Sequence, residues 1–325
     1  MTRFGYHVSH EQHPPSALLE YVRLAERAGF DGALSSDHLA PWLPENGHSG
    51  FAWSWLGAAL QATTMSFGTV CAPGDRYHPV VIAQATATLA ELYPGRFWVA
   101  LGTGEAVNEH VTGNRWPPKD ERQRRLLECV EIMRALWRGE RVTHRGTVQA
   151  IDARVYSLPD QAPRVYGAAV SDDTAGWVGG WADGLITTGR ARDEMERIIT
   201  AFRRGGGTGK PVTVQHVLSW APTTDLARRQ AHEQWRFAAL PNADDLWNLR
   251  TPEEFDRAAA DVSVEMVAEK IPCSADLDFH LQRLRAYVEL GVEHVYVFNA
   301  GRNQREFIET FGVHLRALAP PPPAP

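Results

Sequence analysis

Two polar segments contain the side chains best suited to chemistry. The first is Ser36-Asp37-His38-Leu39-Ala40-Pro41-Trp42, which brings an acid, an imidazole and an indole together. The second is Gly102-Thr103-Gly104-Glu105. An imidazole exchanges protons near neutral pH, and a carboxyl group serves as an acid or base where its surroundings adjust its pKa. Together the two segments indicate a site for proton transfer.

Each of these segments directly follows an apolar run typical of a buried strand. Ala33-Leu34 precedes the first segment, and Phe97-Trp98-Val99-Ala100-Leu101 precedes the second. In α/β folds the active site lies in the loops at the carboxyl ends of the parallel strands. We therefore expect both segments to contribute to one pocket.

Strand-like and helix-like segments alternate along the whole chain, which favours an α/β fold. Strands are expected at 4–6, 32–34, 67–70, 97–101, 165–167, 185–186, 211–218 and 294–298. Helices are expected at 17–28, 53–63, 80–92, 121–138, 172–178, 277–290 and 304–315, with Ser16 as the cap of the first. About eight strands alternating with helices predict a (β/α)8 TIM barrel, and an open doubly wound sheet is the alternative.

Two segments interrupt this alternation and are interpreted as insertions. Residues 141–156 are expected to form a hairpin after the fourth helix, because Arg145-Gly146 separates two alternating runs. Residues 222–270 are polar and helix-prone, and are expected to cover the mouth of the barrel at its C-terminal face. Residues 1–318 are expected to form a single domain, and the proline-rich residues 319–325 a disordered tail.

The composition argues against several classes of partner. The net charge of −6 disfavours nucleic acid, which needs a basic footprint. No apolar run approaches the roughly 18 residues that cross a bilayer, so we expect no membrane partner and a cytoplasmic protein. The run Arg122-Gln123-Arg124-Arg125 is interpreted as a solvated helix face.

No metal ion is expected at the residues that could bind one. Cys71, Cys129 and Cys273 lie far apart, with the spacing neither of a metal site nor of a disulfide framework. The cluster His7, His10, Glu11 and His13 matches no known ligand spacing and is interpreted as a polar loop after the first strand.

Three motifs, taken in order, resemble the bacterial luciferase-like oxidoreductases. They are Ser36-Asp37-His38 with Pro41-Trp42, then Arg76-Tyr77-His78-Pro79 with Ile82-Ala83-Gln84-Ala85, then Gly102-Thr103-Gly104-Glu105-Ala106 with Asn108-Glu109. The most similar branch contains the glucose-6-phosphate dehydrogenases that use the deazaflavin coenzyme F420, and within it a subgroup thought to use FMN. The resemblance implies a TIM barrel that holds the cofactor ring at the carboxyl ends of its strands.

The resemblance also implies roles for individual residues. His38 would take the proton of a substrate hydroxyl, Glu105 would supply the proton that the reduced ring needs, and Trp42 would position the substrate. Asp37 would hydrogen-bond the cofactor ring, and Thr69-Val70 would form a non-proline cis peptide beneath it. Thr103, Gly104 and Asn108 would line the cofactor.

The sequence departs from the family pattern at sites that bind phosphate. Val170-Ser171 replaces a glycine pair, although Ser171 still offers a helix start that can hold an anion. Arg190 aligns with a lysine that binds the substrate phosphate and keeps its charge, whereas Glu269 aligns with a second such lysine. These departures disfavour glucose 6-phosphate as the substrate, and they favour FMN slightly over F420 as the cofactor.

The expected function is a flavin- or deazaflavin-dependent oxidoreductase that transfers hydride between its cofactor and a small organic substrate. With FMN, the reduced flavin could also activate oxygen. One alternative is an F420-dependent dehydrogenase of an alcohol or sugar. Others are a non-catalytic flavin-binding barrel and a cofactor-free hydrolase that uses His38 and Glu105. A homodimer is expected by analogy with the proteins that the sequence resembles.

Overall fold

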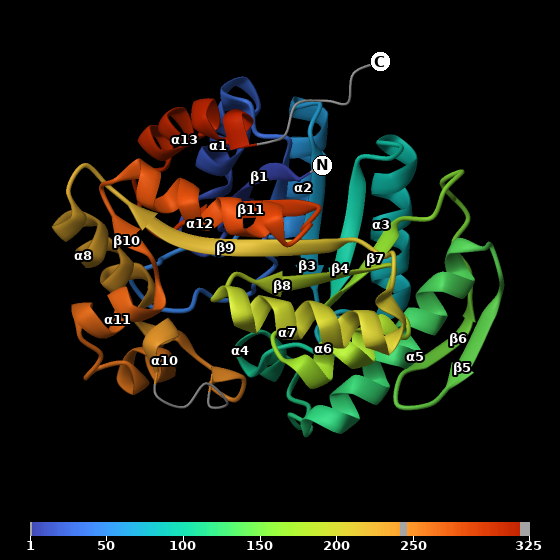
Figure 1. Cartoon of the computed structure of the whole chain (residues 1–325). Coiled ribbons are helices and arrows are strands. Elements are labelled where there is room, and N and C mark those ends of the chain that lie inside the picture. The colour runs from blue at the N-terminus through green and yellow to red at the C-terminus, as the bar shows by residue number, and fades with distance from the viewer. Residues whose placement is uncertain (1, 241–245, 319–325) are drawn as a thin grey trace, which may run out of the picture.

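Eight parallel strands close into a barrel at the centre of the computed structural model, which describes residues 2–240 and 246–318 (Figure 1). In order around the barrel they are β1 (Arg3–Val8), β2 (Gly32–Ser35), β3 (Ser66–Cys71), β4 (Phe97–Leu101), β7 (Arg164–Ala168), β8 (Gly184–Thr188), β9 (Val212–Trp220) and β11 (His294–Asn299). Pairing of β8 with β9 and of β11 with β1 closes the ring, and the short β10 (Cys273–Ser274) pairs with the end of β9. The predicted (β/α)8 barrel is confirmed, and the open sheet is wrong.

Helices pack around the outside of the barrel. They are α1 (Pro15–Ala28), α2 (Ala52–Ala62), α3 (Pro79–Leu92), α5 (Lys119–Trp137), α6 (Asp172–Gly179), α7 (Arg192–Phe202), α12 (Leu277–Glu289) and α13 (Gln304–Leu318). The expected cap at Ser16 is wrong, because α1 begins at Pro15 with Pro14 as its N-cap. A proline suits the first helical position, where its missing N–H would have no helical partner.

The inside of the barrel is filled by aromatic side chains. Trp98 and Tyr166 lie with their ring centroids 4.7 Å apart, and Tyr296 lies 5.9 Å from Trp98. Glycine opposite each large ring makes this packing possible: a Cβ on Gly68 would lie 2.0 Å from a ring carbon of Trp98. Because this layer fills the barrel, a ligand has to bind above it, at the carboxyl ends of the strands.

The predicted hairpin is present between α5 and β7. Strands β5 (Val142–Arg145) and β6 (Gln149–Ala153) pair antiparallel beside α5 (Figure 1). His144 Nε2 lies 3.1 Å from Glu128 Oε2 on α5, and His78 Nε2 lies 2.7 Å from the Gln149 carbonyl oxygen. These contacts attach the hairpin to α5 and to the start of α3.

In its described part, the second insertion contains three helices that follow β9. They are α8 (Thr224–Trp235), α10 (Pro252–Ala258) and α11 (Val264–Lys270), and a 3-10 turn (Arg236–Ala239) follows α8. Each helix begins with a side-chain cap, since Thr223, Thr251 and Ser263 each accept a backbone N–H. The expected helical cover is confirmed for the described part of 222–270, while residues 241–245 lie outside the described residues.

Two further expectations concern the C-terminal residues and the absence of a membrane-spanning segment. The predicted disordered tail, 319–325, lies outside the described residues. None of the helices in the described ranges is long and apolar enough to cross a membrane.

Candidate active site

His38 lies between two carboxylates at the carboxyl end of the barrel. It follows β2, and its Nε2 lies 3.5 Å from Glu105 Oε2 and 3.7 Å from Glu11 Oε1. Glu105 follows β4 and Glu11 follows β1, so three strand ends contribute one side chain each. The structure therefore brings together His38 and Glu105, as the sequence predicted, and adds Glu11.

Asn108 fixes the orientation of the His38 ring. Its Oδ1 accepts the Leu39 backbone N–H at 2.8 Å, so its Nδ2 faces His38 Nδ1 at 3.2 Å and Glu105 Oε2 at 3.3 Å. An amide nitrogen can only donate, and Nδ1 must therefore accept. The neutral ring then carries its proton on Nε2, the nitrogen that faces the two carboxylates.

The two carboxyl groups beside His38 have opposite pKa shifts. Burial acts to raise the pKa of Glu11, but the charge of His38, a backbone N–H and the hydroxyls of Ser36 and Ser9 together lower it. Those hydroxyls donate to Glu11 Oε2 at 2.8 and 2.9 Å. Burial raises the pKa of Glu105, and the charge of Glu11 raises it further. Glu11 is therefore the stable anion, and Glu105 is the group poised to hold a proton.

Trp42 forms an aromatic wall beside His38. Its ring centroid lies 4.6 Å from that of His38 and 4.9 Å from that of Phe237, on which it stacks. Phe255, on α10, meets Trp42 edge to face at 5.2 Å. Because Phe237 and Phe255 belong to the insertion after β9, this segment covers the site.

Asp37 presents an unpartnered oxygen next to this group. Its Oδ1 accepts the Tyr77 hydroxyl at 2.9 Å and lies 3.4 Å from an Arg76 nitrogen, whereas its buried Oδ2 has no hydrogen-bond partner. Burial raises the pKa of Asp37, even though Arg76, Tyr77, His38 and the Trp53 indole all oppose the shift. The Trp53 Nε1 atom, which is also without a hydrogen-bond partner, is the protein donor that acts on this carboxylate. A buried carboxylate oxygen without a partner is rare in a native protein and indicates a missing ligand or water.

The expected cis peptide at Thr69-Val70 is wrong, since this bond is trans. Both residues lie inside β3, where Thr69 pairs with Ser35 and Val99 and Val70 pairs with Ala100. The Thr69 hydroxyl donates to the Ser35 carbonyl at 3.1 Å, and Val70 packs inside the barrel. The ladder with β4 runs through both residues, whereas the ladder with β2 ends at Thr69.

The loop after β4 places Thr103 and Gly104 next to Glu105. Gly104 has a φ of 85°, which a side chain disfavours, and a Cβ there would lie 3.2 Å from Glu109 Cγ. The short helix α4 (Ala106–Glu109) begins directly afterwards and carries Asn108. Thr103, Gly104, Glu105 and Asn108 therefore occupy one loop and its adjoining helix.

Val170, Ser171 and Arg190 lie together in a second part of the same barrel end. They line a cavity of about 360 Å³ between the first turns of α6 and α7. Ser171 caps α6, and Arg190 Nη1 lies 3.3 Å from Glu194 Oε2. The substrate role of Arg190 stays a prediction, and Glu269 is an exposed residue of α11.

The interpretation of residues 122–125 as a solvated face is wrong for two of the arginines. Arg122 and Arg125 are buried, and only Arg124 has a largely exposed side chain, with an exposed fraction of 65 %. Arg125 Nη1 lies 3.4 Å from Asp75 Oδ2, and Arg122 Nη1 donates to the Gly104 carbonyl at 3.2 Å. The start of α5 packs against the loops after β3 and β4, which removes these two side chains from solvent.

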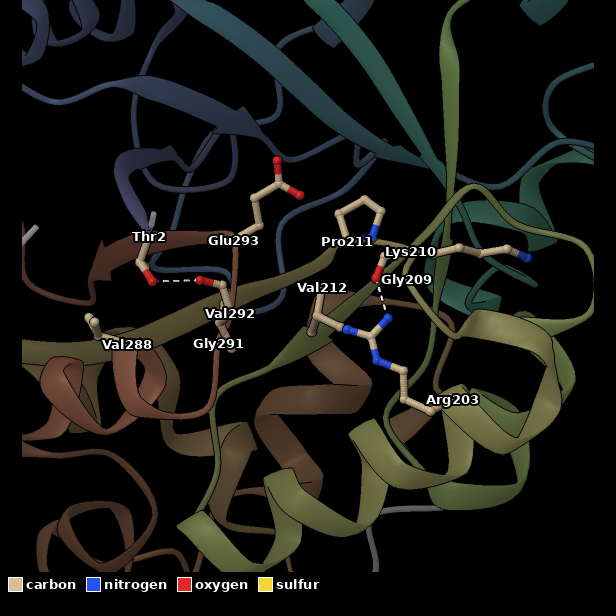
Figure 2. Close-up of a pocket in the computed structure, with 10 residues that line it drawn as sticks. All are labelled: Thr2, Arg203, Gly209, Lys210, Pro211, Val212, Val288, Gly291, Val292 and Glu293. Carbon is tan, nitrogen blue, oxygen red and sulfur yellow. Dashed lines mark hydrogen bonds between the residues drawn. The ribbon is translucent and has the colours of Figure 1, made fainter. Parts of the chain in front are cut away.

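A larger cavity lies at the opposite end of the barrel and is not part of this site. Its volume is about 520 Å³, and it is lined at the amino ends of β1, β9 and β11 by residues such as Thr2, Val212 and Glu293 (Figure 2). Its two cations are already engaged, since Lys210 Nζ donates to the Gly179 carbonyl and Arg203 to two carbonyl groups. Side chains at this end of a TIM barrel contribute to stability.

The cluster of His7, His10, Glu11 and His13 is a buried part of the packing, and His7 belongs to β1 itself, not to a loop after it. His7 meets Phe298, His10 meets Trp55 and His13 meets Tyr21 through ring contacts. In the described part of the chain, no group of three or more His, Cys, Asp or Glu side chains is arranged to hold a metal ion.

Comparisons with known proteins agree with the motifs. The family model described as luciferase-like monooxygenase matches residues 1–294. The chain is 38% identical to an F420-dependent glucose-6-phosphate dehydrogenase of Microbacterium testaceum, covering 95% of each chain. It is 38% identical to the enzyme of the same name from Beutenbergia cavernae, covering 96% of this chain and 95% of the relative. Among solved structures, an F420-dependent secondary alcohol dehydrogenase in complex with an F420-acetone adduct superposes with a TM-score of 0.89, 29% identity and coverage of 98% and 100%.

Proposed function

This chain belongs to the luciferase-like monooxygenase family, and from that premise we propose that it is an F420-dependent dehydrogenase of a neutral alcohol. It is an oxidoreductase of the flavin- or deazaflavin-dependent kind. The similar proteins described above are named for F420, and they give no support to the slight preference for FMN. Oxygen activation stays a prediction tied to FMN.

The residues present fit a cofactor of this kind. The unpartnered Asp37 Oδ2 offers a buried acceptor for a polar edge of the ring. Thr103, Gly104 and Asn108 would line the ring. The cavity at Val170 and Ser171 would take the phosphate, with the Ser171 cap and the first backbone N–H groups of α6 as donors. Arg190 and Arg197 line this cavity and favour an anion, whereas the carboxylates of Asp172, Asp173 and Glu194, which also line it, oppose one.

The observation that carries the chemistry is the His38 imidazole between Glu11 and Glu105. Bound F420 would supply the acceptor for the hydride that leaves the alcohol carbon. His38 Nε2 would exchange the proton of the substrate oxygen, and Glu105 would give the second proton to the reduced ring. One hydride and one proton leave the alcohol, and a ketone or aldehyde is the product.

The tautomer set by Asn108 decides what His38 has to do before it acts. With its proton on Nε2, the neutral ring can donate a hydrogen bond to a substrate oxygen, but it has no lone pair there to accept a hydroxyl proton. Alcohol oxidation therefore requires the tautomer with its proton on Nδ1, and uptake of the substrate proton by Nε2 makes the ring an imidazolium. The Glu11 carboxylate, 3.7 Å away, is the stable anion that would stabilise this cation. In carbonyl reduction the imidazolium gives its Nε2 proton to the substrate oxygen.

The charges around His38 favour a neutral substrate over a phosphorylated one. Glu11 and Glu105 flank the imidazole, and a phosphate dianion placed beside them would be repelled. Trp42, Phe237 and Phe255 provide apolar surface suited to a small aliphatic alcohol.

The test is a titration of the purified protein with F420, FMN and FAD, followed by fluorescence or absorbance, and then turnover assays. We expect tight binding of F420 only, and reduction of F420 with isopropanol but not with glucose 6-phosphate. Binding of FMN in place of F420 would overturn the cofactor. Turnover of glucose 6-phosphate at a rate above that of isopropanol would overturn the substrate class.

We also propose that the protein is a homodimer that pairs through α2 and α3. The sequence of α2 has no charged residue, and Glu91 is the only one in α3. Apart from the exposed Glu91, the outer faces of these helices carry small or uncharged side chains, among them the exposed Ala58 and Val81. Such a surface can approach a second copy closely without burying charge. A cytoplasmic location stays a prediction.

A further inference from the structure

Arg122 is a buried cation next to the loop that carries Glu105. The residue as a whole is 8 % exposed, and the Trp116 ring centroid lies 4.3 Å from its Cζ atom. Its Nη1 donates to the Gly104 carbonyl at 3.2 Å, and its buried Nε has no hydrogen-bond partner. Arg124, two residues away, is exposed and pairs with Asp120 at 2.9 Å. The two arginines of one helix therefore have very different surroundings.

Arg122 makes no direct ion pair with a carboxylate of the described residues. Burial lowers its pKa, the charge of Arg125 lowers it further, and the charge of Glu105 opposes both. Burying a guanidinium without a paired acid costs several kcal/mol. A buried charge of this kind is expected where it interacts with a neighbouring ionisable group. For Arg122 that group is Glu105, whose negative charge raises the pKa of the Arg122 guanidinium.

The contacts of Arg122 connect the covering segment to the Glu105 loop. The Trp116 indole, which lies over the guanidinium, donates to Asn248 Oδ1 at 3.1 Å. On the other side of Glu105, the Ala106 backbone N–H donates to the Trp247 carbonyl at 3.0 Å. The peptide before Glu105 is thus held by Arg122, and the residue after it by the segment that covers the site.

We propose that Arg122 is a positioning residue for proton transfer by Glu105. Its guanidinium holds the Gly104 carbonyl, and so the backbone from which Glu105 projects, and its charge favours the carboxylate form of Glu105. The inference rests on the proposed role of Glu105 as a proton donor. It adds that the donor is controlled by a residue that touches neither substrate nor cofactor.

The direction of the effect follows from the groups that face Glu105. His38, Arg76 and Arg122 lower its pKa, whereas burial and Glu11 raise it. Asn108 donates to its Oε2 at 3.3 Å. Removing the charge of Arg122 leaves the other groups in place, so Glu105 holds its proton to a higher pH. Of the five contributions, that of Arg122 is the smallest, so only the direction of the shift is expected from it.

The experiment compares Arg122→Gln and Arg122→Lys with Arg124→Gln as the matched control on the same helix. The first readout is the carboxyl band of Glu105 in an infrared pH titration of the protein without added cofactor, assigned by its loss in Glu105→Gln. The second is the pH profile of turnover with F420. This design separates the inference from the proposed function, because the infrared titration reports on Glu105 whether or not F420 binds.

We expect Arg122→Gln to move the midpoint of Glu105 and the matching limb of the turnover profile upward, because a cation that lowers the pKa of Glu105 is lost. Arg122→Lys should keep the midpoint close to wild type but reduce turnover, because lysine keeps the charge and loses the planar fork. An unchanged midpoint in Arg122→Gln, or an equal shift in Arg124→Gln, overturns the proposal. If Arg122→Gln does not fold, Arg122→Met takes its place, and we expect the same upward shift of the Glu105 midpoint.

Discussion

Replacing His38 by alanine tests the centre of the proposed mechanism. The side chain exchanges a proton through Nε2, and a positioned acid or base contributes about 10²- to 10⁴-fold to a rate. The upper part of this range applies here, because His38 also lowers the pKa of Glu105 and helps to keep Glu11 ionised. Its removal leaves two carboxylates facing each other and disturbs a second proton-transfer group. We expect turnover to fall about 10³- to 10⁴-fold, or about 4 to 5.5 kcal/mol in the barrier.

The same substitution should leave folding and cofactor binding nearly intact. The His38 side chain is 13 % exposed, and its removal breaks one hydrogen bond with Asn108 and a ring contact with Trp42. We expect a loss of stability of about 1 kcal/mol, measured by urea unfolding. The dissociation constant for F420, measured by fluorescence titration, should change less than twofold because Asp37 is untouched. His314→Ala, on the exposed face of α13, is the control.

Two outcomes would refute this reasoning. A loss of turnover smaller than tenfold would mean that His38 does not transfer the substrate proton. A large loss of F420 affinity with little loss of turnover at saturating cofactor would mean that His38 belongs to the cofactor site instead.

Three further predictions concern a binding contact, a buried acid and a surface. Asp37→Asn should weaken F420 binding at least tenfold, since it changes the buried carboxylate whose Oδ2 is unpartnered; an unchanged dissociation constant would remove Asp37 from the cofactor site. Burial raises the pKa of Glu109 to about 7, so the folded protein binds a proton there more tightly than the unfolded chain does. The contribution of Glu109 to the free energy of unfolding is therefore fully present below pH 4.5 and is lost as the pH rises through 7. Glu109→Gln should therefore gain up to about 3 kcal/mol relative to wild type between pH 5 and pH 8 in urea unfolding, and a constant difference would contradict the shift. Ala58→Glu should convert the dimer to monomers in analytical ultracentrifugation, whereas a monomeric wild type would refute the homodimer.

The barrel could be predicted from the sequence because its strands carry strong local signals. The run 97–101 is apolar throughout, as expected for a strand buried on both faces, and its predicted bounds match β4. The first cap was predicted wrongly because Ser16 is a good N-cap by type, whereas Pro14 and Pro15 determine the start of α1 by geometry. Residue preference and backbone geometry compete at such a position.

From the sequence, Glu11 was interpreted with its neighbouring histidines as part of a polar loop after the first strand, and no role in the site was predicted for it. Its contact with His38 depends on barrel closure, which places the loop after β1 beside the loop after β2. One signal was available: Glu11 follows the first strand as His38 follows the second. If the polar residues that follow each predicted strand had been compared, instead of polar residues that are neighbours in the sequence, Glu11 would have been identified as a site residue.

Arg122 and Arg125 show a second kind of missed signal. Four polar residues in a row resemble a solvated helix face when they are counted by composition. Residues three positions apart lie on the same face of a helix, so Arg122 and Arg125 were candidates for a common buried side, away from Arg124. What they face could not be read from the sequence, because Asp75 and Gly104 belong to other loops.

The three groups at the centre of the site have to be treated as one titrating unit. Each of the two carboxylates lies within 4 Å of His38 Nε2, and His38 contributes to the pKa shift of both. The apparent pKa values of activity therefore belong to the cluster and not to single residues. A pH profile alone cannot then assign the base, because Glu11→Gln and Glu105→Gln would both move it. The two are separated by direction. Glu11→Gln removes the anion that stabilises the His38 imidazolium, and it should slow alcohol oxidation, in which this cation forms, more than ketone reduction. Glu105→Gln should slow both directions alike, because Glu105 serves the cofactor ring.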